Sequence, residues 1–187
     1  RNIYWVHVGS GCIYEGDNGG QGFSEDDAPN YTGSFYSKTK LWIDQILQEF
    51  PVLVLRLRMP FDGSDNPRNL ITKISKYDRL LDDDNSMTYL PDFLSVSKQL
   101  IDKRKTGMYH VVNPGTTSPY RIMQLYKEIV DPTKVFEKLS MDHLSEVATS
   151  GRSNCMLDTS KLEAEGITMR PIEEALREAL EELAKTK

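Results

Sequence analysis

Three short apolar runs, rich in β-branched and aromatic residues, constrain the fold of this chain most strongly. They cover residues 3–8, 51–57 and 108–112. Each is short for a helix, and near-continuous apolar runs are typical of strands buried on both faces of a parallel sheet. The segments 34–48 and 91–105, which lie between these runs, have the apolar spacing of helices. Strands that alternate with helices predict an α/β fold with a parallel sheet.

The predicted helix 34–48 contains a tyrosine and a lysine four residues apart, Tyr36 and Lys40. This spacing places both side chains on one helix face. A phenol normally keeps its proton up to pH ~10, but a neighbouring ammonium favours the phenolate, so the hydroxyl can transfer a proton at neutral pH. Such a pair suits carbonyl reduction, in which a proton reaches the oxygen as hydride reaches the carbon. By spacing alone, an ordinary surface pair is the better explanation of the two residues.

Small polar residues follow the first apolar run, in Gly9-Ser10-Gly11-Cys12. In open α/β sheets, binding sites lie beyond the carboxyl ends of the strands. Ser10 and Cys12 are two residues apart, which returns both side chains to one face of an extended chain. A thiol beside a ketone can form a thiolate and remove a proton from the adjacent carbon. The competing interpretation is a small buried hydrophobic residue, the common fate of a free cysteine.

Four separated motifs occur together in one order along the chain. They are GSGCIYE at 9–15, PNYTGSFYSKTK at 29–40, RLRMP at 56–60 and NPRNLITK at 66–73. With these motifs the chain resembles the extended short-chain dehydrogenase/reductases. More closely, it resembles the bifunctional UDP-4-keto-6-deoxyglucose 3,5-epimerase/4-reductases, or nucleotide-rhamnose synthases. The similarity continues through VNPG at 112–115 and RSN at 152–154.

The resemblance implies roles for the residues at matching positions. Ser10 matches the catalytic hydroxyl that binds the sugar ketone. Tyr36 and Lys40 match the proton donor and its partner, which also contact the nicotinamide. Cys12 matches the base of the epimerisation, and Lys73 matches the acid on the opposite face of the sugar. The alternative for Lys73 is one more exposed lysine.

The same resemblance implies the residues that bind cofactor and substrate. Met59 and Pro60, after the second predicted strand, are expected against the nicotinamide. Asn69 and Arg152 are expected to bind the nucleotide-sugar, the arginine because a guanidinium fork suits a diphosphate. Asn69 falls in a helix predicted over residues 67–76, whose proline suits the first helical position.

The activity implied by the resemblance is the 3,5-epimerisation and 4-keto reduction of UDP-4-keto-6-deoxyglucose to UDP-L-rhamnose, with NADPH or NADH as the reductant. One alternative is a reductase of the dTDP-4-dehydrorhamnose type, which needs Ser10, Tyr36 and Lys40 but neither Cys12 nor Lys73. Another is a non-catalytic, reductase-like subunit that regulates a partner enzyme.

Composition narrows the classes of partner. The net charge of −5 comes without a basic stripe, which argues against nucleic acid because phosphate binding needs clustered lysine and arginine. No apolar run approaches the ~20 residues that span a bilayer. Two cysteines without a C-x-x-C pattern predict reduced thiols, no metal site and a cytoplasmic location.

A glycine-rich phosphate loop between a strand and a helix does not precede Ser10. The sequence is therefore expected to be the C-terminal part of a longer enzyme, with the N-terminal half of a Rossmann-type fold, or also a fused dehydratase, upstream. The predicted fold is the C-terminal part of a doubly wound parallel sheet with a smaller helical substrate-binding portion. Residues 1–60 belong to the sheet with the catalytic helix, and residues 61–187 mostly bind substrate, except that 91–113 return a helix and a strand to the sheet.

The strand predicted at residues 3–8 has consequences for association. An apolar strand at a sheet edge promotes aggregation unless another strand or chain covers it. We therefore expect missing N-terminal strands or another chain to pair there. A homodimer is also expected, with helix 34–48 at the subunit interface.

Overall fold

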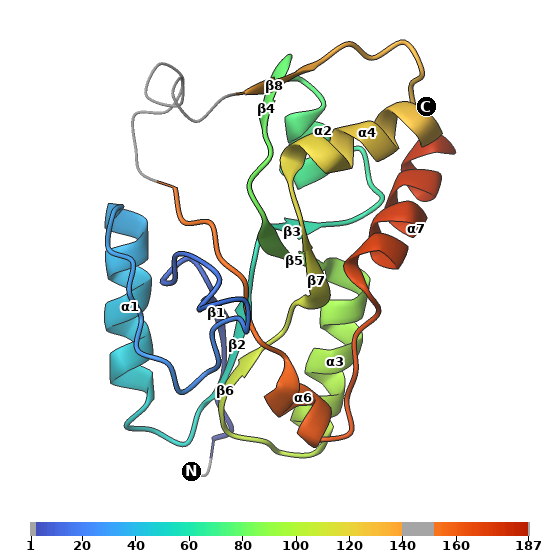
Figure 1. The fold of residues 1–187 in the computed structure, drawn as a ribbon. Helices are drawn as coiled ribbons and strands as arrows, with labels where there is room; N and C mark the ends of the chain where they lie inside the picture. Colours follow the sequence, from blue (N-terminus) through green and yellow to red (C-terminus); the bar gives the residue numbers. More distant parts are fainter. Residues whose placement is uncertain (1–2, 140–151, 187) are drawn as a thin grey trace.

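The structure is a computed structural model that describes residues 3–139 and 152–186. Its main sheet has three parallel strands, β1 (Val6–Ser10), β2 (Leu53–Leu57) and β6 (Gly107–His110), in the order β1-β2-β6 (Figure 1). These strands correspond to the three apolar runs, so the predicted α/β fold with a parallel sheet is confirmed.

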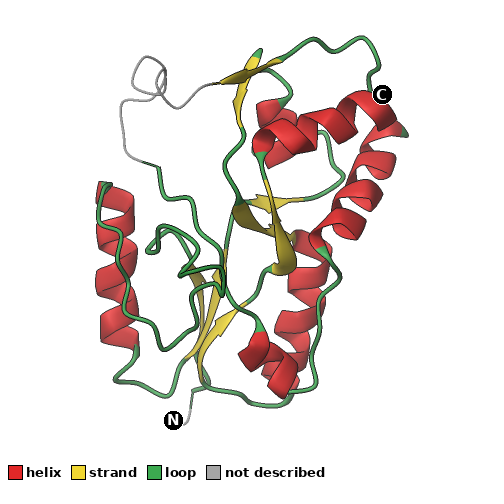
Figure 2. Cartoon of the chain, in the orientation of Figure 1, coloured by secondary structure: helices red, strands yellow, loops and turns green. Residues whose placement is uncertain are grey.

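Helices cover both faces of this sheet. Helix α1 (Phe35–Leu47) lies on one side, and α3 (Leu90–Asp102) and α6 (Ser160–Ala164) lie on the other (Figures 1 and 2). Along β2, Leu53 packs in the core that contains residues of α3 and α6, whereas Val54 packs with the end of α1. Alternate residues of one strand thus face opposite helix layers, which explains the near-continuous apolar run.

The rest of the described chain builds a second, mostly helical part around its own core. Two short sheets belong to it, one of β3 (Pro60–Phe61), β5 (Asn85–Tyr89) and β7 (Asn113–Thr117), and one of β4 (Arg79–Leu81) and β8 (Glu137–Leu139). Its helices are α2 (Leu70–Ile74), α4 (Pro119–Ile129) and α7 (Ile172–Ala184). Their apolar sides meet in one cluster that includes Ile71, Ile122 and Leu176. The division of the sequence at residue 60 stays a prediction.

Helix α2 differs from the helix predicted over 67–76. It begins at Leu70, because the side chain of Asn69 accepts a hydrogen bond from the amide of Ile71 at 3.2 Å and so caps the first turn. The proline at 67 therefore precedes the helix. None of the helices in residues 3–139 and 152–186 combines the length and the apolar composition needed to cross a membrane.

Candidate active site

The register of the parallel sheet brings two strand ends together. Ser10, the last residue of β1, is opposite Leu57, the last residue of β2, and the amide of Gly11 donates to the carbonyl of Leu57 at 3.0 Å. The residues that follow the two strands, Cys12 on one side and Arg58 on the other, therefore meet at one edge of the sheet. This is the edge at which open α/β sheets carry their sites.

A cavity of about 330 Å³ opens at this edge. Five of the residues predicted for the site line it: Cys12, Tyr36, Met59, Lys73 and Arg152. They come from five separate stretches of the chain, and the fold gathers them around one hollow. Ser10, Lys40, Pro60 and Asn69 are not among the residues that line this cavity.

The tyrosine and the lysine of the Tyr-x-x-x-Lys motif lie on one face of α1. Tyr36 is in the first turn with 52% of its surface exposed, and the Lys40 ammonium is 5.7 Å from the centre of its ring. Ser34 fixes the start of the helix, because its hydroxyl accepts from the amide of Ser37 at 3.0 Å. The phenol is thereby presented to the cavity with a cation beside it.

Ser10 is buried, with 4% of its surface exposed. Its hydroxyl oxygen accepts a hydrogen bond from the amide of Cys12 at 3.2 Å. This bond shapes the turn that carries Cys12 into the cavity wall. The serine hydroxyl therefore supports the thiol in addition to any contact with a ligand.

Cys12 is half-buried, and its sulfur accepts a hydrogen bond from Nη1 of Arg58 at 2.8 Å. Cys155 differs, because it is fully buried, and burial raises the pKa of its thiol. Its sulfur donates to the carbonyl of Gly11 at 3.4 Å. The structure thus describes one thiol in a cavity beside a cation, that of Cys12, and one thiol in the core, that of Cys155.

Of the other residues that line the cavity, Lys73 comes from α2 and Arg152 from the segment before Cys155, and both side chains are exposed. Asn69, in contrast, is buried and uses its side chain within the protein. Its amide nitrogen donates to the carbonyls of Asp62 and Ser64, at 2.8 and 2.7 Å. The side chain of Asn69 therefore stabilises the loop at Asp62–Ser64 and the start of α2. Its contact with substrate stays a prediction.

A second cavity of about 380 Å³ adjoins the first. Four residues line both hollows: Ile74, Tyr77, Pro119 and Arg152. The apolar side chains of Leu80, Leu81 and Leu139 extend this second cavity away from Cys12. Together the two hollows form a cleft with reactive groups at one end and an aromatic and apolar lining at the other.

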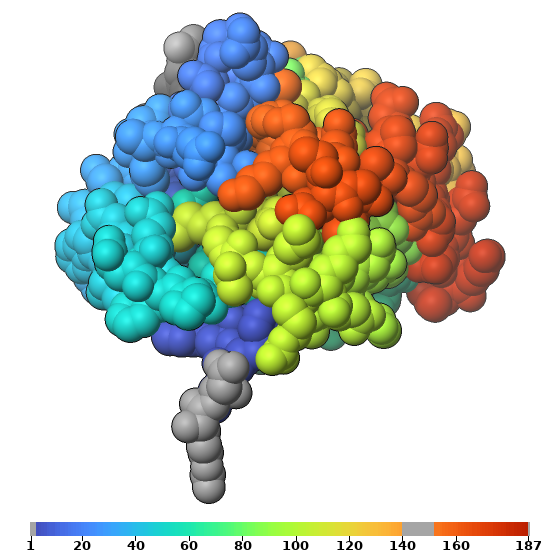
Figure 3. All heavy atoms as spheres, turned by 90° about the horizontal axis from the view of Figure 1, so that it is seen from below, coloured from blue at the N-terminus to red at the C-terminus, as the bar shows by residue number. Residues whose placement is uncertain are grey.

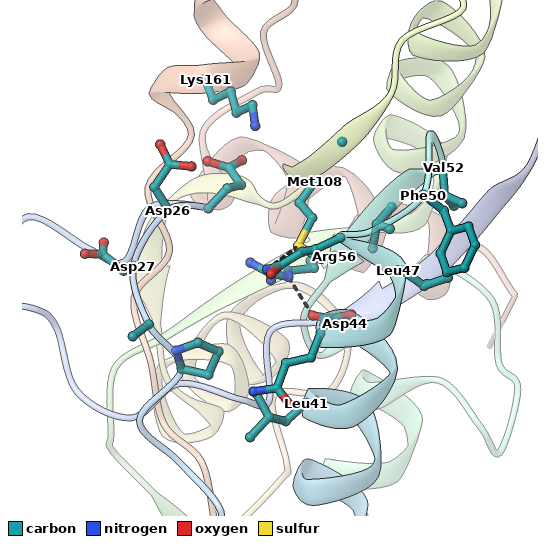
Figure 4. Close-up of a pocket in the computed structure, with 17 residues that line it drawn as sticks. Asp26, Asp27, Leu41, Asp44, Leu47, Phe50, Val52, Arg56, Met108 and Lys161 are labelled. Atoms are coloured by element: carbon teal, nitrogen blue, oxygen red, sulfur yellow. Dashed lines mark hydrogen bonds and ion pairs between the residues drawn. The ribbon is translucent and has the colours of Figure 1, made fainter.

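A cavity of about 530 Å³ lies elsewhere, beside the C-terminal half of α1 (Figure 4). Its wall contains the buried ion pair between Arg56 and Asp44, whose Nε and Oδ2 atoms are 2.8 Å apart. None of the residues predicted for the site lines it. We therefore assign the candidate active site to the smaller cleft.

Among the cleft residues that sequence reasoning missed are Arg58, Tyr31 and Tyr77. Arg58 lies inside the RLRMP motif, directly after a predicted strand, and this position was the signal that was available. Tyr31 and Tyr77 lie in irregular segments. Nothing in their local sequence indicates that the fold turns them toward Cys12.

Comparisons with known proteins agree with this fold. Among solved structures, a dTDP-4-dehydrorhamnose reductase from Yersinia enterocolitica superposes with a TM-score of 0.81 over 97% of this chain and 67% of that chain, at 16% identity. The fold is thus that of a nucleotide-sugar reductase. The model of the RmlD substrate binding domain matches residues 1–185, and the chain belongs to this family.

Two relatives have higher identity. A bifunctional dTDP-4-dehydrorhamnose 3,5-epimerase/dTDP-4-dehydrorhamnose reductase of Arabidopsis thaliana is 38% identical over 94% of this chain and 61% of its own length. The crystal structure of the L780 UDP-rhamnose synthase from Acanthamoeba polyphaga mimivirus has a TM-score of 0.91 and 35% identity, covering 97% of this chain and 65% of that chain. This chain therefore spans less than two thirds of each relative.

Proposed function

We propose that this chain is the substrate-binding and catalytic part of an enzyme that converts UDP-4-keto-6-deoxyglucose to UDP-L-rhamnose by 3,5-epimerisation and 4-keto reduction. One observation carries the proposal: Cys12, Tyr36 and Lys73 line a single cavity. The first and last of these are needed only for epimerisation, which favours the bifunctional activity over a reductase alone. The bifunctional Arabidopsis relative and the mimivirus UDP-rhamnose synthase support the same assignment.

For epimerisation, Cys12 is the base and Lys73 the acid. The thiolate of Cys12 removes the proton from the carbon next to the ketone, and the electron pair moves onto the ketone oxygen as an enolate. Tyr36 binds that oxygen, and Ser10, which does not line the cavity, stays predicted to bind it as well. Lys73, on α2, returns a proton to the opposite face of the carbon and so inverts it. The reaction occurs once at C3 and once at C5.

For reduction, the phenol of Tyr36 gives its proton to the C4 oxygen, and the Lys40 ammonium beside the ring favours the phenolate that remains. A nicotinamide, as NADPH or NADH, supplies the hydride when it is bound. The site fits such a group. The exposed phenol of Tyr36 has the Lys40 ammonium beside its ring, and Tyr36 and Met59 line the same cavity. Pro60, exposed directly after Met59, is proposed to contact it as well.

The nucleotide is proposed to occupy the second cavity of the cleft. Arg152, which lines both hollows, would then hold the diphosphate between the sugar and the base. Tyr77 offers an exposed aromatic ring at the same junction. Asn69 was also predicted to bind substrate, and it stays a prediction.

The remaining expectations about the whole protein are proposals too. We propose that it includes the N-terminal half of the Rossmann-type fold, which would hold the rest of the dinucleotide. A fused dehydratase is a further possibility, as in a trifunctional Arabidopsis relative of which this chain covers 27%. We further propose a cytoplasmic homodimer without nucleic-acid or membrane partners.

The proposal is tested with Cys12→Ala in the whole protein. We expect the variant to lose solvent deuterium incorporation at C3 and C5 by at least ~100-fold, the lower end of what general base catalysis contributes. It should still reduce a 4-ketone that is already epimerised. Mass spectrometry of the product formed in heavy water measures both.

Cys155→Ala is the matched control, because it removes the second thiol outside the cavity. It should keep both exchange and reduction. Unchanged exchange in Cys12→Ala would contradict the proposed base and leave the reductase-only alternative. A whole protein that neither exchanges nor reduces would favour the non-catalytic alternative.

A further inference from the structure

Arg58 is the buried cation of the candidate active site. It follows β2 directly and exposes only 2% of its surface. Its Nη2 donates to the side-chain oxygen of Asn85 at 2.7 Å and to the carbonyl of Ser153, and its Nη1 donates to the sulfur of Cys12 at 2.8 Å. Two neutral oxygens thus fix one end of the guanidinium, and the other end points at the thiol.

Among the residues that the structure describes, no carboxylate forms an ion pair with Arg58. Arg56, which is equally buried two residues earlier, forms an ion pair with Asp44 at 2.8 Å. Within residues 3–139 and 152–186, Arg58 forms no such pair with an aspartate or glutamate, and its Nε has no hydrogen-bond partner. Burying a charge without a partner of opposite charge costs free energy. A buried cation such as Arg58 therefore favours the ionised form of a neighbouring group that can become an anion.

We propose that Arg58 is a positioning residue that holds Cys12 as a thiolate, directed at the substrate. Of the three groups that accept hydrogen bonds from the Arg58 guanidinium, Asn85 and Ser153 offer neutral oxygens, and only the thiol of Cys12 can become an anion. The Tyr31 phenol and the Cys155 thiol also lie near Arg58, but burial raises the pKa of both groups. Ionisation of this thiol would balance the buried charge. The inference rests on the proposed function, because it explains how Cys12 acts as a base.

Arg58 takes no proton in this step. The C–H bond next to the ketone breaks, its proton forms the S–H bond of Cys12, and its electron pair moves to the enolate oxygen. The guanidinium stays charged throughout, since arginine does not deprotonate in proteins. Its fork shape lets two donors engage Asn85 and Ser153 while a third reaches the sulfur, and a lysine has no such geometry.

The test measures the rate at which iodoacetamide alkylates Cys12 in the whole protein between pH 5 and 10. In Arg58→Met, we expect the rate at pH 7 to fall at least ~10-fold, which corresponds to a shift of about one pH unit in the profile. Arg58→Lys should give an intermediate profile. Arg177→Met, which removes an exposed arginine of α7, is the control and should leave the profile unchanged. Cys155 is an internal reference, because its burial keeps it unreactive.

A second measurement needs no arginine variant, in case Arg58→Met does not fold. The difference in thiolate absorbance at 240 nm between the unaltered protein and Cys12→Ser should already be present at pH 7. If it appears only above pH ~8, as for an ordinary thiol, or if Arg58→Met alkylates like the unaltered protein, the inference is wrong. Exchange that survives in Cys12→Ala would instead refute the proposed function, so the two failures are distinct.

Discussion

His110, at the end of β6, is a fully buried histidine in its neutral form. Its Nε2 is 3.1 Å from Nη1 of Arg56, and its Nδ1 is 3.3 Å from the carbonyl of Asp158. The arginine can only donate, so Nε2 accepts and Nδ1 carries the proton. Burial, together with the charge of Arg56, lowers the pKa of His110 to about 3. A second proton, on Nε2, would have to lie between the imidazole ring of His110 and the guanidinium of Arg56.

This arrangement predicts how stability depends on pH. Between pH ~6.5, where an unfolded histidine takes up a proton, and the pKa of about 3 in the folded chain, the unfolded state binds more protons. The free energy of unfolding therefore decreases as the pH falls through this window. Between pH 6.5 and 5 we expect His110 to cost on the order of 1 kcal/mol.

The variant His110→Gln isolates this contribution, because a glutamine side chain offers an oxygen to Arg56 and does not titrate. Burial raises the pKa of Asp44 and of Glu25, and these groups titrate in both proteins and cancel in the comparison. Urea unfolding at pH 7.5, 6.5 and 5 should show the unaltered protein losing stability relative to His110→Gln. A constant difference across these pH values would contradict the prediction.

At the scale of single residues, the sequence could place the reactive groups but not the groups that surround them. Cys12, Tyr36 and Lys73 were predicted because their chemistry appears in short motifs, and all three line the cavity. Arg58 was missed because a charged residue is normally expected at the surface. Its burial directly after β2 appears only in the structure. Asn69 was predicted to bind substrate. In the structure its side-chain amide caps helix α2. The sequence alone does not distinguish an asparagine that caps a helix from one that binds substrate.

Helix α1 shows how an element can carry chemistry. Ser34 caps its N-terminus through the amide of Ser37, one residue after Tyr36. In Ser34→Ala the cap is lost, so we expect the free energy of unfolding to fall by about 1 kcal/mol. Because the first turn then frays, the rate of ketone reduction should also fall several-fold.

Ser118 provides the matched control. It caps α4 in the same way, with its hydroxyl accepting from the amide of Arg121 at 3.1 Å, and it does not line the cleft. Ser118→Ala should cost a similar amount of stability, measured by urea unfolding, and leave ketone reduction unchanged. Equal losses of activity in both variants would mean that general stability, not the position of Tyr36, decides the rate.

At the scale of elements, the sequence predicted the parallel strands and β4, and it missed β3, β5, β7 and β8 of the second part. The runs at β1, β2 and β6 are apolar because helices cover both of their faces. In contrast, β7 contains a proline and a glycine within Asn113–Thr117, a composition typical of a loop. Its pairing with β5 is set by contacts between distant segments, which local propensity does not encode.

At the scale of the whole molecule, several of the exposed apolar side chains lie at one edge of the main sheet and on helix α1. Strand β1 is at the edge of the main sheet, and Ile3 before it is 78% exposed. In a view from below, the dark blue N-terminal segment reaches the surface beside the cyan end of α1 (Figure 3). On α1, Phe35, Trp42 and Ile46 are exposed at 78%, 55% and 60%, and their spacing puts them on one face. We call these three residues the α1 stripe.

Exposed apolar area of this kind promotes association. We expect the 187-residue chain on its own to self-associate with rising concentration. Because a charge in the α1 stripe opposes burial, Ile46→Glu should shift the chain toward the monomer. Sedimentation velocity over a concentration series measures the distribution. Leu94→Glu, which changes an exposed leucine of α3 outside the stripe, is the control and should have no such effect.

The same substitution in the whole protein separates the two possible occupants of the α1 stripe. If a second subunit covers it, as the proposed homodimer requires, Ile46→Glu yields a folded monomer. If N-terminal elements of the same chain cover it, the variant keeps its oligomeric state and loses stability in urea, because a carboxylate then enters a packed interface. A whole protein that changes in neither property would show that the stripe stays in contact with solvent, and the proposed role of α1 in the dimer would be wrong.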